Sequence, residues 1–215
     1  MTIYKYEGKI TGANIFWVTA LLVSAFSALS ISGGGLVNWS FLGYEVIFPF
    51  YMVIAVGEWG KFRADPVFEL ISAQAESLFR WIFARYLYIF GVISAFAAAG
   101  MAAVCIIRHE VPFPDLLITY ISTALLFSSA CTLLCVLCRR EHAATAGCGV
   151  TLLFFMMAKA MLRLFPFTKY FYPFIRFVWN DNRDWLMNKC VLLFLSLIIW
   201  VLIFIICRGR KGIAD

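Results

Sequence analysis

Charged residues and histidines are scarce in this chain. Asp, Glu, Lys and Arg make up 14% of the 215 residues, and there are two histidines, His109 and His142. The two lie 33 positions apart in different linkers, and no HExxH or CxxH pattern surrounds either, so no metal site is predicted. The sequence has no GxSxG motif, which argues against the nucleophile elbow of a hydrolase. It also has no GxxxxGK[ST] motif, which argues against ATP binding through a P-loop in this chain. We therefore expect no enzyme activity, and no cofactor, from the chain itself.

The cysteines do not show the spacing of a disulfide framework. The seven cysteines mostly lie inside apolar runs or at their ends, where cysteine behaves as a small hydrophobic residue. Cys135 and Cys138 form a C-x-x-C spacing, but no second pair completes a zinc or redox motif. Cysteines packed in an apolar core are the simpler interpretation.

Long apolar runs dominate the sequence. Apolar residues make up 63% of the chain, far above the usual share in a soluble domain. A bilayer crossing needs roughly 20 apolar residues in a helix, because lipid cannot satisfy an open sheet edge. The sequence predicts one all-α transmembrane domain over residues 1–215, with six spans near residues 14–33, 41–57, 81–107, 115–138, 142–162 and 186–207. The first span has no small-residue cleavage site after it and is expected to stay in the protein.

The basic residues are distributed unevenly between alternate linkers. More Lys and Arg fall in the N-terminal stretch, the 58–80 and 139–141 linkers and the C-terminal end than in the other linkers. The positive-inside rule then places both termini and the 58–80 linker in the cytoplasm. The formal charge of +6 is explained by lipid headgroups, so we expect contact with membrane lipid and none with nucleic acid.

Two charged residues interrupt the predicted spans. Glu45 lies in the second span, a little over one turn from its outer end, and an interfacial carboxylate is the favoured interpretation. Lys159 lies near the outer end of the fifth span, from which its ammonium can reach the headgroups. Both are candidate residues of a substrate path.

The segment Lys61–Arg80 is the longest charged interval between apolar runs. Asp65 and Pro66 are typical of a helix start, with an oxygen acceptor at the cap and a ring at the first position. Apolar residues then recur every three or four positions, and Glu76 and Arg80 lie one turn apart. The pattern predicts an amphipathic helix over residues 65–79. It lies on a membrane surface, as a plain interfacial anchor, or in the groove of a soluble partner.

Two other segments carry structural signals. Ala95–Ala103 is rich in small residues and predicts close packing against another helix. Residues 163–185 are dense in Phe, Tyr and Trp but are broken by Pro166 and Pro173. We expect this outer aromatic segment to form one or two short interfacial or re-entrant helices.

Together these features resemble the ABC-2 type permeases, the membrane subunits of a class of bacterial ABC exporters. The stretch from Glu58 to Arg85 is similar to the family pattern of a glutamate ending the second span, then Glu-Leu-apolar-Ser, a basic residue and the third span. The matching positions are Glu58, Glu69-Leu70-Ile71-Ser72, Arg80 and Arg85. The usual Gly-Thr before Glu-Leu is here Pro66-Val67-Phe68.

The resemblance implies a role for the amphipathic helix as a coupling helix. It would dock on a separately encoded ABC ATPase, present in two copies, which binds ATP and Mg²⁺. The implied ATPase-coupling residues are Asp65, Phe68, Glu69, Ser72, Glu76 and Arg80. The chain would pair with a second permease copy or a paralogue in the bacterial cytoplasmic membrane and export an amphipathic or hydrophobic substrate, a peptide among the candidates.

Two other classes of membrane protein fit the same sequence. A substrate-capture subunit of a vitamin importer has a similar size and also six spans. A non-transporting immunity or sensor protein would bind a peptide without ATP. A neighbouring gene with a P-loop and no membrane spans favours the exporter over both.

Overall fold

The computed structural model describes residues 14–32, 40–60, 78–107, 112–138, 141–158, 166–178 and 184–211. Within these ranges the chain is helical and has no strand. The long helices are α2 (Asn14–Ser32), α4 (Phe48–Gly60), α6 (Leu78–Ile107), α7 (Phe113–Leu137), α8 (Glu141–Met157) and α11 (Trp185–Lys211). Short elements are the π-helix η1 (Leu42–Ile47), the 3-10 helix η3 (Pro166–Tyr170) and α10 (Ile175–Val178). The all-α prediction is confirmed for the described residues.

Five helical segments are long and apolar enough to cross a bilayer: α2, η1 with α4, α6, α7 and α11. The sixth predicted span, residues 142–162, corresponds to α8, which ends at Met157 and is 17 residues long. Residues 159–165 lie outside the described ranges. The structure thus supports a multi-pass membrane protein with five spanning helices and one shorter apolar helix.

The third long helix begins earlier than predicted. Leu78, Phe79 and Arg80 belong to the first turn of α6, whereas the sequence pattern assigned them to the end of a separate amphipathic helix. Leu78 is fully buried because it starts the stripe by which α6 packs on its neighbours. This stripe recurs every three or four residues: Ile82, Tyr86, Ile89, Ile93, Ala97, Gly100, Met101 and Val104.

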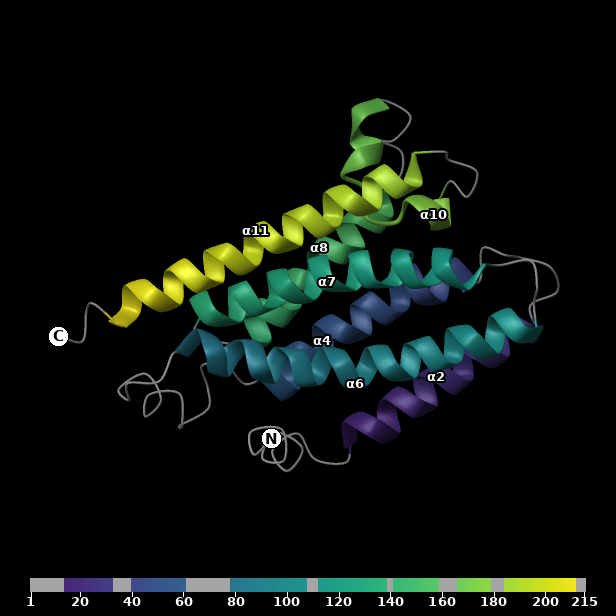
Figure 1. The fold of residues 1–215 in the computed structure, drawn as a ribbon, viewed down its shortest axis with the longest axis horizontal. Helices are drawn as coiled ribbons and strands as arrows, with labels where there is room; N and C mark the ends of the chain where they lie inside the picture. The colour runs from purple at the N-terminus through teal and green to yellow at the C-terminus, as the bar shows by residue number, and fades with distance from the viewer. Residues whose placement is uncertain are drawn as a thin grey trace.

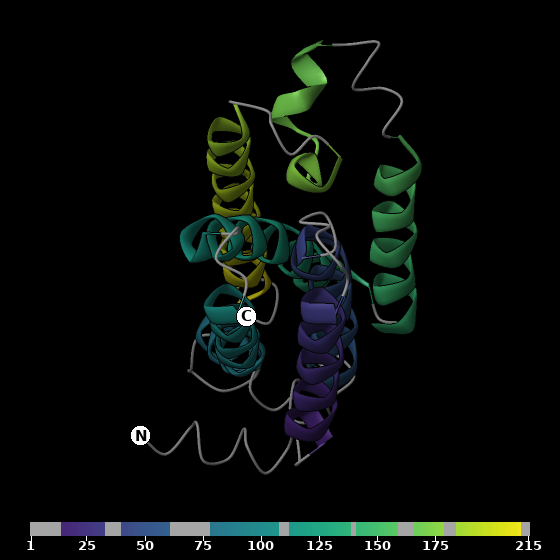
Figure 2. The ribbon, with the colours of Figure 1, turned by 90° about the vertical axis from the view of Figure 1, so that its right-hand side faces the viewer.

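Helix α7 lies at the centre of the bundle and packs against α4, α6, α8 and α11 (Figure 1). Pro114 and Asp115 lie in its first turn. The proline ring fixes φ near the helical value, and the negative charge of Asp115 suits the positive end of the helix dipole. Helix α6 packs between α2 and α4. Helices α8 and α11 flank opposite sides of the bundle (Figure 2).

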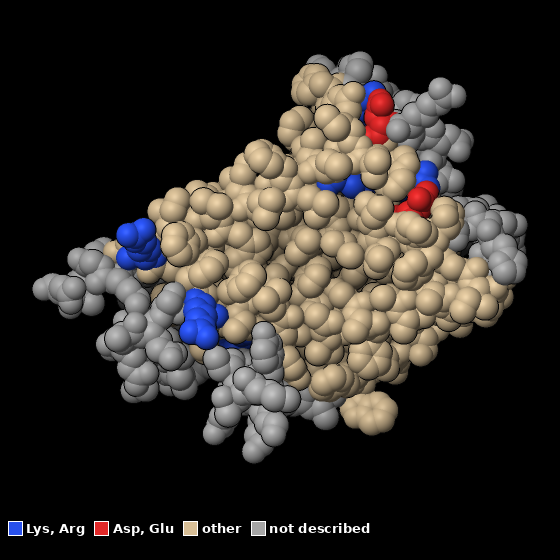
Figure 3. Space-filling model, in the orientation of Figure 1, with Lys and Arg blue, Asp and Glu red and all other residues tan. Residues whose placement is uncertain are grey.

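The helix ends sort into two groups along the bundle. The start of α2, the end of α4, the start of α6 and the ends of α7 and α11 lie toward the left in Figure 1. Figure 3 shows blue Lys and Arg side chains at the left end of that face, and basic beside acidic residues at the upper right. The charge-bearing helix ends that sequence analysis assigned to one membrane side therefore do lie together.

The predicted small-residue face of α6 packs against α2. A methyl group added at Gly100 would lie 2.5 Å from Val23 Cγ1, closer than real Cβ atoms approach another atom, and 3.0 Å from Ser27 Oγ. Gly100 is therefore needed for the close approach of the two helices, as the small residues predicted.

Hydroxyl pairs join the helices inside the bundle. Tyr51 of α4 lies 2.8 Å from Thr19 of α2, oxygen to oxygen, and Tyr86 of α6 lies 2.8 Å from Ser128 of α7. Tyr120 and Ser94 form a third pair at 3.1 Å. In a bilayer the lipid tails are as apolar as the helix surfaces, so the hydrophobic effect does not drive the helices together. Hydrogen bonds such as these therefore add to the van der Waals packing between the helices.

We expect Tyr86→Phe to lower the free energy of unfolding by about 0.6 kcal/mol, the typical strength of an interhelical hydrogen bond in lipid. A double-mutant cycle with Ser128→Ala, measured by reversible unfolding in mixed micelles, isolates the pair from changes in packing. A coupling energy of zero would contradict this role.

Candidate functional site

A buried ion pair between Glu45 and Lys189 is the centre of the candidate site. Both side chains are fully buried, and Lys189 Nζ lies 2.6 Å from Glu45 Oε1. Glu45 comes from η1 and Lys189 from the second turn of α11, so the pair joins two segments far apart in sequence. Burying two charges is costly, and an ionisable residue within a membrane span is a functional-site candidate by default.

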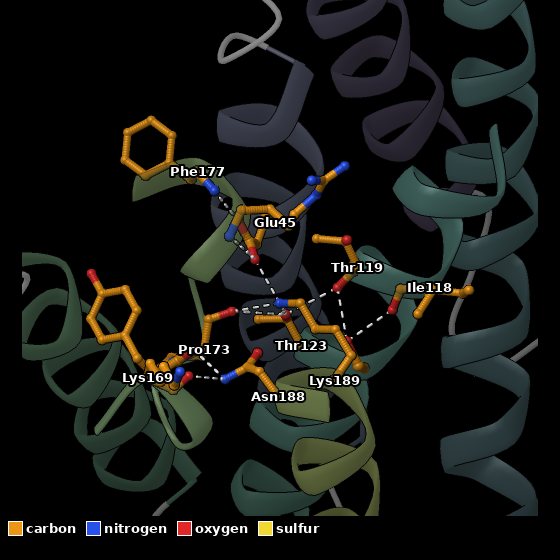
Figure 4. Close-up of polar contacts among 12 residues, drawn as sticks. Glu45, Ile118, Thr119, Thr123, Lys169, Pro173, Phe177, Asn188 and Lys189 are labelled. Carbon is orange, nitrogen blue, oxygen red and sulfur yellow. Dashed lines mark hydrogen bonds and ion pairs between the residues drawn. The ribbon is translucent and has the colours of Figure 1, made fainter. Parts of the chain in front are cut away.

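Glu45 accepts two further hydrogen bonds from the backbone of α10. The N–H of Phe177 donates to Oε2 at 2.6 Å and the N–H of Arg176 donates to Oε1 at 3.3 Å. With the ammonium of Lys189, three donors surround the carboxylate (Figure 4). Hydrogen bonds of this kind to a carboxylate are among the stronger ones in proteins, so they hold the Glu45 side chain in a fixed position.

Lys189 uses all three of its ammonium hydrogens. Besides Glu45, it donates to the carbonyl of Pro173 at 2.8 Å and to the hydroxyl of Thr123 at 3.2 Å (Figure 4). Two of its three acceptors are neutral. The ammonium therefore keeps hydrogen-bond partners from α7 and from the segment before α10 if Glu45 is removed.

We call residues 166–178, from η3 through α10, the strap. It lies over one end of the bundle, at the upper right in Figure 1. Phe174 and Ile175 are fully buried, and Phe174 stacks on Phe127 of α7 with ring centroids 5.9 Å apart. The predicted outer aromatic segment thus contains two short helices, and part of it packs into the protein.

Further polar contacts hold the strap to the long helices. Arg176 Nη2 lies 2.8 Å from Asp115 Oδ2 of α7, and the Arg176 guanidinium lies over the rings of Phe41 and Trp185 at 4.8 and 4.7 Å. Asn188 of α11 donates to the backbone carbonyls of Lys169 and Tyr172 at 2.8 and 2.9 Å. The strap is therefore fixed to η1, α7 and α11 at once.

Two groups on the strap have shifted pKa values. The hydrogen bond of Lys169 with Asp184 raises the pKa of the lysine above its usual range. Burial, and to a smaller degree the negative charge of Glu45, raises the pKa of the Tyr172 phenol to about 12. At physiological pH both groups carry their proton, so the Lys169 side chain is charged and the Tyr172 side chain is neutral.

A second charged contact lies at the opposite end of α4. The guanidinium of Arg85, in α6, is almost fully buried and donates to the backbone carbonyl of Gly60 at 3.0 Å. It also lies over the Trp81 ring at 4.3 Å. A cation at the carbonyl end of a helix is favourable, and this one ties the end of α4 to the start of α6.

The structure corrects one interpretation and leaves others untested. Sequence analysis favoured an interfacial Glu45, but the strap and α11 cover the side chain completely. Of the coupling residues, Arg80 lies in α6, whereas Asp65, Phe68, Glu69, Ser72 and Glu76 lie outside the described residues. Lys159 also lies outside them.

Sequence analysis missed the partners of Glu45. It did not single out Lys189, although the residue lies inside the predicted span 186–207. A lysine inside one span and a glutamate inside another were the available signal, because such charges usually pair in lipid. Thr123 and Asn188 gave no comparable signal in sequence.

The described residues contain no group of three His, Cys, Asp or Glu side chains arranged to hold a metal ion. All seven cysteines are free, with Cys135 buried and Cys138 exposed. The chemistry that this cluster offers is electrostatic: it fixes a carboxylate and an ammonium between four chain segments. Comparison with known protein families, curated proteins and solved structures finds no match for this chain.

Proposed function

We propose that this chain is the membrane subunit of an ATP-driven exporter of the ABC-2 type, with six spans and cytoplasmic termini. It pairs with a second permease chain and with two copies of a separate ATPase, and it moves an amphipathic or hydrophobic substrate outward. The stretch before α6, residues 65–77, acts as the coupling helix that receives the motion of the ATPase.

The observation that carries this proposal is the contact between Arg85 and Gly60. These residues belong to the two helices that border the 61–77 stretch, and the contact joins the end of α4 to the first turns of α6. A force applied to the connecting stretch therefore acts on both helices together. Such joining is what a coupling element between a motor and a membrane domain requires.

Helix α4 provides a route from that end of the bundle to the ion pair. It is 13 residues long, about 20 Å at the rise of an α-helix, and it continues directly into η1 and Glu45. The strap that Glu45 holds lies at the other end of the bundle (Figure 1). Motion of α4 would therefore reach the strap through η1 alone.

The test is ATPase stimulation in a reconstituted complex. The full chain in nanodiscs is mixed with the separate P-loop ATPase proposed as its partner, and ATP hydrolysis is measured with and without the chain. We expect stimulation by the natural chain. We also expect Phe68→Ala and Glu69→Ala to reduce it at least tenfold, as the loss of about 1.4 kcal/mol of docking energy would do.

His142→Ala is the matched control, because the His142 side chain is highly exposed and its charged contact among the described residues is a 3.6 Å approach to the half-exposed Glu58. It should stimulate as the natural chain does. Full stimulation by both coupling variants would exclude this helix as the docking element, and the absence of any stimulation would contradict the exporter assignment.

A further inference from the structure

The element that carries Glu45 is a π-helix rather than an α-helix. The six residues Leu42–Ile47 form η1, and the N–H of Phe48 donates to the carbonyl of Gly43, five residues earlier. A π turn takes in one more residue than an α turn, and isolated π turns inside α-helices occur frequently at functional sites.

Pro49 gives a local reason for this wide turn. In a regular α-helix its ring would collide with the carbonyl of the residue four positions earlier, which is Glu45. Its nitrogen also has no hydrogen to donate to that carbonyl. A wider turn before Pro49 relieves the collision at the residue that carries the carboxylate.

The two sides of η1 belong to different parts of the protein. On one side, Phe41 lies under the Arg176 guanidinium and Glu45 bonds to the strap backbone and to Lys189. On the other side, Phe48 and the rest of α4 pack against α6, α7 and α8. The π turn is therefore the joint between the strap contacts and the body of α4.

We propose that η1 is a register switch: conversion of its π turn to an α turn that brings Glu45 into the helical register of α4 withdraws the carboxylate from the strap. An α-helix uses fewer residues per turn, so the same six residues reach farther along the axis after conversion. Displacement of α4 toward its Gly60 end favours that longer form. The source of the displacement rests on the proposed function, whereas the switch itself does not.

The surroundings of the ion pair limit which contacts are lost when it opens. When Glu45 leaves, Lys189 keeps Pro173 and Thr123 as acceptors, and Arg176 keeps its ion pair with Asp115. What the strap loses is the acceptor for two of its backbone amides, those of Arg176 and Phe177. Hydrogen exchange at these two amides therefore reports the state of the switch directly.

Two single-residue deletions form a matched pair for the test. Each shortens the six-residue turn by one and so converts it to an α turn. Deletion of Ile47, after Glu45, leaves the carboxylate on the strap side of the joint. Deletion of Leu42, which precedes Glu45, brings Glu45 into the helical register of α4. The carboxylate then points away from the strap.

The measurement is hydrogen exchange of the Arg176 and Phe177 amides in the purified full chain, without ATPase. We expect deletion of Leu42 to raise exchange at least tenfold, to the level of Glu45→Ala, and deletion of Ile47 to leave it within about twofold of the natural chain. Equal exchange in the natural chain and the Leu42 deletion would overturn the switch. So would equal increases in both deletions.

Pro49→Ala is the second variant, for use if the Leu42 deletion fails to fold. It removes the collision that favours the π turn, so exchange at the two amides should rise several-fold, and unchanged exchange would overturn the switch. Adding the ATPase and ATP to the natural chain should raise the same exchange. If the deletions behave as expected but ATPase and ATP do not change the exchange of the two amides, the switch is retained and the exporter assignment is refuted.

Discussion

Replacing Glu45 with alanine is expected to lower the free energy of unfolding by about 3–5 kcal/mol, because it leaves the buried ammonium of Lys189 without its counter-charge. The carboxylate is fully buried and its three donors come from α10 and α11. Reversible unfolding in mixed micelles, followed by circular dichroism, measures the change.

Two further variants separate the charge from the packing. Glu58→Ala removes a half-exposed carboxylate at the other end of α4 and should change stability by less than about 0.5 kcal/mol. The double variant Glu45→Met with Lys189→Met removes both charges and should recover most of the loss, since apolar pairs often replace buried ion pairs without cost. A single Glu45→Ala variant as stable as Glu58→Ala would contradict the burial of the pair.

Gly57→Val is expected to destabilise the bundle by about 1–3 kcal/mol, because there is no room for a side chain between α4 and α8. A Cβ atom at Gly57 would lie 1.9 Å from the hydroxyl oxygen of Thr145 and 3.0 Å from its Cβ. The two helices would have to separate. The thermal unfolding midpoint of the purified chain measures the effect.

Gly91 supplies the control for this substitution. It lies in α6 with no atom within 4 Å of its added Cβ, so Gly91→Ala should stabilise the helix by up to about 1 kcal/mol. Thr145→Ala combined with Gly57→Val removes the hydroxyl and methyl that collide and should recover part of the stability. A Gly57→Val variant that melts with the natural chain would show that α8 packs elsewhere.

The long helices could be predicted from sequence because their signal is local. Hydropathy alone locates α6, α7 and α11, and the small residues near Gly100 identify the face of α6 that packs closely. The start of α6 was misplaced by three residues. The reason is that Leu78 satisfies the apolar period of α6 as well as that of the preceding amphipathic segment.

The candidate site was less predictable because it depends on long-range packing. The position of Glu45 along its own helix indicates how far it lies from a helix end, but not that a segment 130 residues later folds over it. The π turn could not be predicted from the sequence either, because Pro49 within an apolar run predicts only a kink or a break. Charges within predicted spans, such as Glu45 and Lys189, were the signal that pointed to a buried ion pair.

The ion pair also has a consequence for how the protein is made. Glu45 and Lys189 are separated by 144 positions, and ribosomes add about 5–20 residues each second. Glu45 is therefore part of the nascent chain for about 7–30 s before Lys189, its counter-ion, is synthesised. During that interval the carboxylate has no counter-ion, and a chain truncated before α11 would keep it uncompensated.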